Sequence, residues 1–404
     1  MVTGAADDDC SAIGTYASAG AQFGLGFLWT APLTFPMMFA VVYLSSKLGL
    51  VTGRGLISVV AERYPKWVLW PMLIGVLAGN TIEAGADIAG MAASLNIFVP
   101  VPPFLTAIAV AVTILLFQLF ASYTFIRNIF RWLALSLFAY IGSAILARPG
   151  PFEVLRGTLV PHIEMSKDFL SILVAVIGTT LSAYLYTWQS NVEVEEKRAE
   201  GKTKLSERQG ASEDDLRRSQ RDIVVGMAFS NIVMYFIILS TGATLHKTGH
   251  TDIDNAAQAA QALRPLAGSA AEFLFAIGVV AVGFLAVPVM TTGAAYDLAQ
   301  ALGWRSSLHA HPRQAKAFYG LIAGFTLLAV LLNGLGFNPM KALVYAGIVQ
   351  GFSTPPLMLF IVLMTSDRRL MGDKVNSFWL NVLSWLTVAA IFAATIGLVA
   401  SWFL

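Results

Sequence analysis

The chain has 404 residues, of which 56% are hydrophobic and only 12% are charged, whereas soluble domains carry about 25% charged residues. This composition excludes a soluble globular protein, and the formal net charge of +2 gives no indication of a nucleic-acid partner. The single cysteine, Cys10, excludes an internal disulfide and a thiolate metal cage. The apolar residues occur in runs of about 20, long enough to cross a hydrocarbon layer of about 30 Å as helices. The composition therefore predicts an all-α, polytopic membrane protein.

Hydropathy along the chain predicts membrane-spanning helices in close succession. Residues 13–29 are apolar but too short to cross alone, so we expect them to be the second half of a first span whose first half-helix is missing from this sequence. In the alternative interpretation Met1 is the true start, and Asp7, Asp8 and Asp9 form a solvated tail. The complete spans, which bring the predicted total to eleven, are 27–46, 68–98, 103–121, 128–147, 169–190, 223–245, 271–303, 318–336, 342–364 and 376–404.

The positions of the basic residues predict an orientation. If the partial first span runs outward, the inner segments hold 20 of the 26 Lys and Arg residues and the outer segments hold six. Cytoplasmic loops are enriched in Lys and Arg, so we expect a multi-pass protein of the cell (inner) membrane with a cytoplasmic N-terminus. The one long polar insert, 193–222, mixes both charge signs. It predicts a solvated cytoplasmic connector, with a regulatory loop as the alternative.

Two acidic residues lie within an apolar span, where ionisable groups are costly and call for a role. Glu83 and Asp87 are spaced i, i+4, which places both carboxylates on one helix face. They predict a proton or cation path, and the alternative is a hydrogen-bonded pair inside the bundle. Asp297 lies near the inner end of its span and is expected at the membrane interface.

The run Gly178–Ser182 clusters a glycine with hydroxyl residues in the middle of a span. On its own the run fits an ordinary helix whose hydroxyls bond to the preceding turn. However, the first span and this one each open a set of five spans, and each has a polar break in its middle. Transporters built from inverted five-helix repeats place ion sites where two such interrupted helices face each other. The pattern therefore favours a broken helix at this run.

Three segments carry a resemblance to a known family: 43–65 (YLSSKLGLVTGRGLISVVAERYP), 365–372 (TSDRRLMG) and 17–24 (ASAGAQFG). They are similar to segments of the Nramp family of divalent-metal transporters, and the triple aspartate resembles a divergent bacterial Nramp-related branch. The resemblance implies a leucine-transporter-type fold, with inverted five-helix repeats plus an eleventh helix. The implied division is 1–148 for the first repeat with its truncated first helix, 149–168 for an extracellular connector, 169–367 for the second repeat including the cytoplasmic loop 193–222, and 368–404 for the eleventh helix.

The resemblance also implies a metal site between the broken first and sixth helices. Asp9 keeps the aspartate of the first-helix motif Asp-Pro-Gly-Asn, while Ala12 stands at the asparagine position. Ser182 stands at the methionine of the sixth-helix motif Met-Pro-His, and Thr179 stands where the family offers a backbone carbonyl to the metal. The other positions assigned to the site or to the cation path are Asp8, Gln350, Glu83 and Asp87.

These departures from the family motifs change the donor set. Without the thioether and the amide, the site keeps carboxylate, hydroxyl and carbonyl oxygens, which favour a hard ion such as Mn²⁺ or Mg²⁺. Cys10 is expected to be a small buried filler, with a soft ligand as the alternative. Tyr184 replaces the sixth-helix histidine, which suggests little coupled proton flux.

The predicted function is transport of a divalent metal cation by alternating access. No enzymatic activity and no resident cofactor are expected, since the metal is the substrate and the spans carry no nucleophile–base pair. The alternative function is an amino-acid cation symporter of the same fold, although the three adjacent acids would repel a substrate carboxylate. The expected partners are the metal ion and the lipid bilayer. The sequence does not indicate which oligomeric state the protein adopts.

Overall fold

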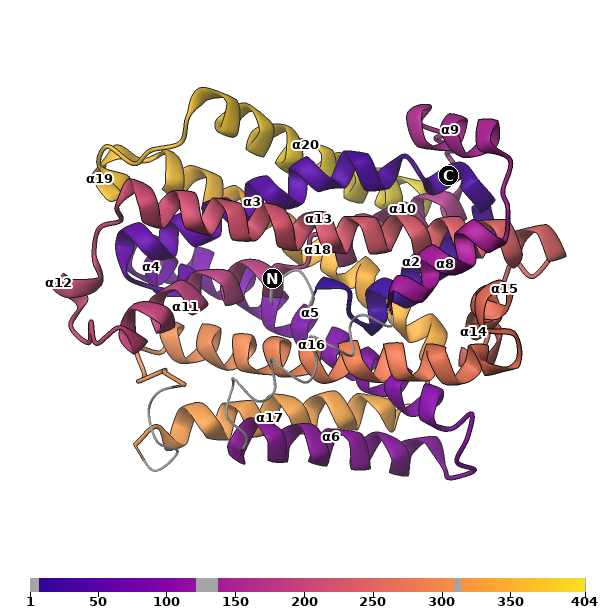
Figure 1. The fold of residues 1–404 in the computed structure, drawn as a ribbon. Coiled ribbons are helices and arrows are strands. Elements are labelled where there is room, and N and C mark those ends of the chain that lie inside the picture. Colours follow the sequence, from indigo (N-terminus) through magenta and orange to yellow (C-terminus); the bar gives the residue numbers. More distant parts are fainter. Residues whose placement is uncertain (1–6, 121–136, 309–313, 404) are drawn as a thin grey trace.

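The computed structural model describes residues 7–120, 137–308 and 314–403, and all regular secondary structure in these residues is helical. Within this part of the chain, eight helical segments are long and apolar enough to cross a membrane. The long helices run side by side through the molecule, and short helices lie at both of its ends (Figure 1). The prediction of an all-α, polytopic membrane protein is therefore confirmed.

The described helices overlap the predicted spans in chain order. The predicted span 128–147 lies mostly outside the described residues, and α8 is its described end. The long helices are α2 (Cys10–Phe23), α3 (Thr30–Thr52), α5 (Lys66–Leu95), α6 (Pro103–Phe120), α10 (Lys167–Thr180), α11 (Ala183–Ala199), α13 (Glu213–Thr244), α16 (Ala271–Ala301), α17 (Lys316–Asn333), α18 (Pro339–Ser366) and α20 (Phe378–Ser401). The shorter helices are α4 (Leu56–Arg63), α8 (Phe138–Leu146), α9 (Pro151–Leu159), α12 (Leu205–Arg208), α14 (Ala256–Ala260), α15 (Arg264–Ala267) and α19 (Arg368–Met371).

Local sequence explains where several helices begin and end. Ser212 precedes α13 and its hydroxyl accepts the N–H of Asp215 at 3.1 Å, while the Asp215 carboxylate accepts the Ser212 N–H at 3.0 Å. This reciprocal pair is a capping box. Asn338 caps α18 by accepting the N–H of Met340 at 2.9 Å. α3 ends at Gly53, whose φ of 64° lies in the left-handed region that glycine adopts without steric cost.

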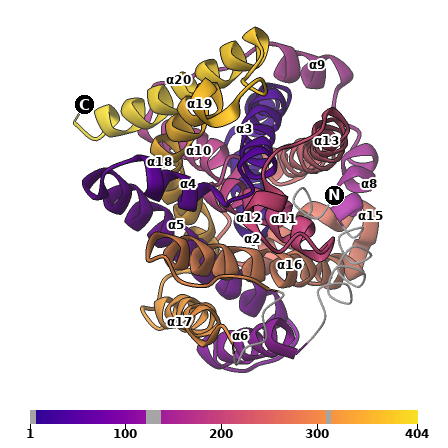
Figure 2. The ribbon, with the colours of Figure 1, turned by 90° about the vertical axis from the view of Figure 1, so that its left-hand side faces the viewer.

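Close backbone contact fixes α10 against α18 beside the interrupted span. A Cβ added at Gly178 would overlap the carbonyl oxygen of Gly347 and lie 2.5 Å from the backbone nitrogen of Gly351. Glycine at Gly178 therefore allows the two helices to approach closely, as small residues do in membrane bundles. α5 packs against α16, α17 and α18, and α2 packs against α13. α6 and α17 lie at one edge of the bundle and α20 lies at the opposite edge (Figures 1 and 2).

The polar insert 193–222 is not solvated along its whole length, and that prediction is wrong for its first part. α11 continues into the insert, and Lys197 on it is buried. The Lys197 ammonium donates to the carbonyl oxygen of Leu50 at 2.6 Å and to those of Arg208 and Gly210 at 2.7 Å. The insert is charged but folded, because three carbonyl groups compensate the buried ammonium.

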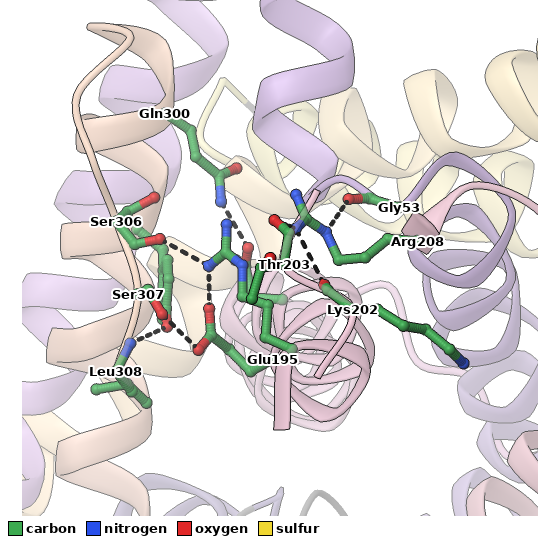
Figure 3. A network of polar contacts seen from close by, with 12 residues as sticks. Gly53, Glu195, Lys202, Thr203, Arg208, Gln300, Ser306, Ser307 and Leu308 are labelled. Carbon is green, nitrogen blue, oxygen red and sulfur yellow. Dashed lines mark hydrogen bonds and ion pairs between the residues drawn. The ribbon is translucent and has the colours of Figure 1, made fainter. Parts of the chain in front are cut away.

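A further set of polar contacts joins α11 to the end of α16 and the segment after it (Figure 3). Ser307 donates to Glu195 at 2.8 Å, and Arg198 donates to the carbonyl oxygen of Ser306 at 3.0 Å. Gln300, near the end of α16, also donates to α11. These contacts close the bundle at the end where α4 and α12 lie.

Candidate metal-binding site

The span with the glycine–hydroxyl run is interrupted in its middle, so the prediction of a broken helix is confirmed. α10 ends at Thr180 and α11 begins at Ala183. Between them Ser182 has an extended backbone, with φ −60° and ψ 140°, and its hydroxyl donates to the Thr179 carbonyl at 2.9 Å. The C-terminus of α10 carries the partial negative charge of a helix end, which favours a cation nearby.

Asp9 is held at the start of α2 by the backbone of the helix that it caps. Its Oδ1 accepts the N–H of Ala12 at 2.7 Å and the hydroxyl of Ser11 at 2.8 Å. Its Oδ2 accepts the hydroxyl of Tyr184, from α11, at 3.1 Å. Asp9 is completely buried. The carboxylate is therefore oriented by groups of α2 and α11, and Ala12 contributes a backbone N–H to it but no polar side chain.

The Ser11 hydroxyl lies at the centre of polar groups that meet where the start of α2 approaches the break between α10 and α11. Its Oγ is 2.8 Å from Asp9 Oδ1, 3.0 Å from Glu83 Oε1 and 3.2 Å from Thr179 Oγ1. These oxygens come from α2, α5 and α10, and all four residues are completely buried. One hydroxyl has one proton, so it cannot donate to both carboxylates at once.

α5 brings its acidic face to the start of α2. Glu83 Oε2 accepts the Gln350 side-chain amide at 2.6 Å, and the same Gln350 nitrogen lies 3.2 Å from Asn80 Oδ1. Asp87 Oδ1 accepts the backbone N–H of Ser11 at 2.9 Å, while Asp87 Oδ2 is buried without a hydrogen-bond partner among the described residues. The predicted site residues of α5 and α18 are thus adjacent to Asp9.

The side chains of Asp8 and Asp9 contact different helices. The Ser230 hydroxyl of α13 lies 2.5 Å from Asp7 Oδ2 and 3.1 Å from Asp8 Oδ1, and it can donate its single proton to one of the two at a time. Asp7 and Asp8 are completely buried. The triple aspartate therefore divides between two contacts, with Asp9 facing Ser11 and its two neighbours facing α13.

Asp297 is completely buried on α16, so its side chain does not face solvent, and its expected place at the membrane interface stays a prediction. The sequence does not predict this burial, because Asp297 stands near the end of an apolar run. In the structure α16 continues past Asp297 to Ala301, and neighbouring helices cover the side chain. Across the described ranges, no three His, Cys, Asp or Glu side chains are arranged to hold a metal ion on their own. A cation bound between the breaks would therefore need hydroxyl and carbonyl oxygens as well as carboxylates.

Several polar residues of this region were not predicted. Ser11 follows the predicted ligand Asp9 by two positions, and only its hydroxyl chemistry distinguishes it in the sequence. Asn80 lies three residues before Glu83 on α5, which is the same helix face, and this spacing is a usable signal. Ser230 and Tyr184 reach the aspartates from α13 and α11, and only tertiary packing reveals these contacts.

A bundle of membrane-length helices, with buried carboxylates and hydroxyls gathered at an interrupted span, defines a membrane transporter of the broken-helix class. A family model described as "Natural resistance-associated macrophage protein-like" matches residues 1–401. The chain belongs to the Nramp family.

Named relatives of the chain are transporters. The "Divalent metal cation transporter MntH" of Klebsiella pneumoniae (strain 342) is 24% identical over 382 residues, which cover 93% of this chain and 87% of the relative. The protein of the same name from Bacillus subtilis (strain 168) is 24% identical over 396 residues, covering 96% of this chain and 88% of the relative. The chain therefore aligns with these proteins over most of its length.

Solved structures agree on the fold. The Eremococcus coleocola manganese transporter has a TM-score of 0.72 at 17% identity, covering 99% of this chain and 85% of that structure. Mhp1, a nucleobase-cation-symport-1 family transporter in a closed conformation, has a TM-score of 0.58 at 14% identity, covering 99% of this chain and 89% of that structure. The leucine-transporter-type fold implied by the sequence is confirmed, and the proteins named here are transporters rather than enzymes.

Proposed function

We propose that the chain carries divalent metal cations across the cell membrane by alternating access, and binds them between the two interrupted helices. The convergence of oxygen atoms on Ser11 carries the proposal. Asp9 and Glu83 both direct a carboxylate oxygen at one hydroxyl that has a single proton. A divalent cation at this point would compensate both carboxylates, which are costly to bury uncompensated.

The donor chemistry supports a hard cation. The oxygens around Ser11 are carboxylate and hydroxyl groups, and the carbonyl groups at the end of α10 lie beside them. Mn²⁺ and Mg²⁺ prefer such oxygen ligands, whereas softer ions prefer sulfur or imidazole. We therefore place Asp9, Glu83, Ser11 and Thr179 around the ion, with Ser182 and Gln350 in supporting contact with Glu83.

The remaining assignments follow from charge and burial. Asp87 extends the carboxylate row of α5 by one turn beyond Glu83, which suits a path for the cation or for a proton. The excess of Lys and Arg in the inner segments supports a cytoplasmic N-terminus. The relatives that are named divalent metal cation transporters also support a metal substrate. An amino-acid substrate is disfavoured, because its carboxylate would meet the buried Asp9 and Glu83.

Uptake of Mn²⁺ by proteoliposomes tests the proposal. Asp9→Asn preserves the shape of the side chain and removes its charge, so uptake should fall to the level of empty vesicles. The matched control is Asp252→Asn, which makes the same change at an exposed loop residue and should transport like the unmodified protein. Full uptake by Asp9→Asn would remove Asp9 from the site.

A further inference from the structure

Two sulfur atoms from distant parts of the chain meet beside the acidic groups. Cys10, on the first turn of α2, directs its thiol to the Val279 carbonyl of α16 at 3.3 Å. A Cβ added at Gly283, one turn further along α16, would overlap Met91 Sδ and lie 2.9 Å from Cys10 Sγ. Both sulfur atoms therefore lie close to the backbone of Gly283, which has no side chain. Cys10 and Met91 are almost completely buried.

A carboxylate with a free oxygen lies next to this sulfur pair. Asp87 and Met91 are spaced i, i+4 on α5, so both side chains project from one helix face. Asp87 Oδ1 bonds to the N–H of Ser11, the residue after Cys10, at 2.9 Å. Asp87 Oδ2 is buried and has no hydrogen-bond partner in the described ranges. A buried, unpartnered carboxylate oxygen is costly, and the helix face that Asp87 shares with Met91 makes this oxygen a candidate third donor.

A small cavity reaches the Cys10 side chain. Its volume is about 10 Å³ and it is bordered by Cys10, Gly90, Ser94, Val279 and Leu343, which is close to the smallest space that holds one water molecule. Ala259 of α14 also borders it, so the cavity extends from Cys10 toward the end of the bundle where the short helix α14 lies. Apolar residues make up most of its lining, so the cavity gives a ligand at Cys10 a little room but few further polar partners.

We propose that the Cys10 thiol, the Met91 thioether and the free oxygen of Asp87 form a second cation site that selects soft, thiophilic divalent ions such as Cd²⁺. Sulfur donors favour such ions over Mg²⁺ and Mn²⁺. Binding forms a bond from the metal to the Cys10 sulfur and releases the thiol proton to solvent, because the thiolate is the metal ligand. The Met91 thioether binds without losing a proton. The two sulfur donors are distinct from the oxygen atoms around Ser11, although Asp87 Oδ1 bonds to the N–H of Ser11, and binding at the sulfur pair does not require transport.

Equilibrium binding of Cd²⁺ to the purified chain in detergent tests the proposal, and the ultraviolet charge-transfer absorption of a cadmium–thiolate bond is the readout. The unmodified protein should show this band, since Cys10 is its only cysteine. Cys10→Ser should abolish the band and weaken Cd²⁺ binding by about tenfold or more, with little change in Mn²⁺ binding.

Met91→Leu separates the paired site from a lone reactive thiol. It keeps the volume of the side chain and removes its sulfur, and it should weaken Cd²⁺ binding by about tenfold while the thiolate band remains. Met227→Leu makes the same change at another buried methionine, on α13, and should leave Cd²⁺ binding unaltered. An absent thiolate band, or equal Cd²⁺ affinities of Met91→Leu and Met227→Leu, would overturn the proposal. Failure of Mn²⁺ uptake would bear only on the oxygen site.

Discussion

The hydroxyl of Ser182 lies 3.2 Å from Oε1 of Glu83 and joins the break between α10 and α11 to the acidic face of α5. The same hydroxyl also bonds to the carbonyl oxygen of Thr179 at 2.9 Å. Ser182 therefore stands between a carboxylate and a helix C-terminus, which are two groups that attract cations. The side chain at position 182 should therefore influence whether the site prefers hard ions such as Mg²⁺ or softer ions such as Cd²⁺.

Ser182→Met should shift selectivity toward softer ions. The thioether adds a soft donor and removes a hydroxyl, so the preference for Mn²⁺ or Cd²⁺ over Mg²⁺ should rise by about tenfold. Inhibition of Mn²⁺ uptake by excess Mg²⁺ in proteoliposomes measures this preference. Ser182→Ala is the control, because it removes the hydroxyl without adding sulfur. Equal Mg²⁺ inhibition of the methionine and alanine variants would contradict the prediction.

Ser11→Ala should weaken metal uptake. The change removes the one hydroxyl that contacts both Asp9 and Glu83 and leaves two buried carboxylates facing each other. The loss of a buried hydrogen bond to a charged group costs about 1.5–3 kcal/mol, so the KM for Mn²⁺ should rise by about tenfold or more. Ser18→Ala is the matched control on the same helix, because within the described part of the chain the Ser18 hydroxyl bonds to the carbonyl oxygen of Gly14 at 2.8 Å and to no carboxylate. A KM equal to that of the control would show that Ser11 is not part of the site.

The spans and the break could be predicted from the sequence because each has a local cause. A helix that crosses the membrane requires a long apolar run, and such runs are visible without any knowledge of packing. The break followed from Gly178 and the hydroxyl residues after it, together with its place at the head of a set of five spans. The fold could therefore be predicted almost completely, although the boundaries of the repeats stay a prediction.

The contacts within the site could not be predicted, because they depend on packing between distant segments. Ser11 and Glu83 are 72 positions apart, and nothing local brings them together. Asp297 is buried by neighbouring helices although it stands near the end of an apolar run. Lys197 belongs to a charged stretch that indicates solvent, yet backbone carbonyls compensate its charge. In each case tertiary packing, and not the local sequence, decides the surroundings of the side chain.

Lys197→Met should destabilise the protein. It leaves the carbonyl groups of Leu50, Arg208 and Gly210 without their donor, which should lower the free energy of unfolding by about 1–3 kcal/mol. Lys202→Met is the control, because Lys202 is exposed and pairs only with the exposed Glu200, whose carboxylate raises the pKa of Lys202. Exposed pairs contribute little to stability, so the control should melt like the unmodified protein. Thermal unfolding in detergent compares the two, and equal midpoints would refute the structural role of Lys197.

The orientation of the protein can be tested with two single-cysteine variants in a Cys10→Ser background. Ser206 on α12 and Ser269 after α15 are both exposed, and α12 and α15 lie at opposite ends of the bundle (Figure 1). The positive-inside rule places the segments rich in Lys and Arg, and with them α12, in the cytoplasm. A membrane-impermeant thiol reagent added to intact cells should therefore label Ser269→Cys and leave Ser206→Cys unlabelled. Permeabilised cells should show labelling of both variants, which confirms that each cysteine is reactive. Labelling of Ser206→Cys alone in intact cells would reverse the proposed topology, because the α12 end would then face outward and the N-terminus would lie outside the cell.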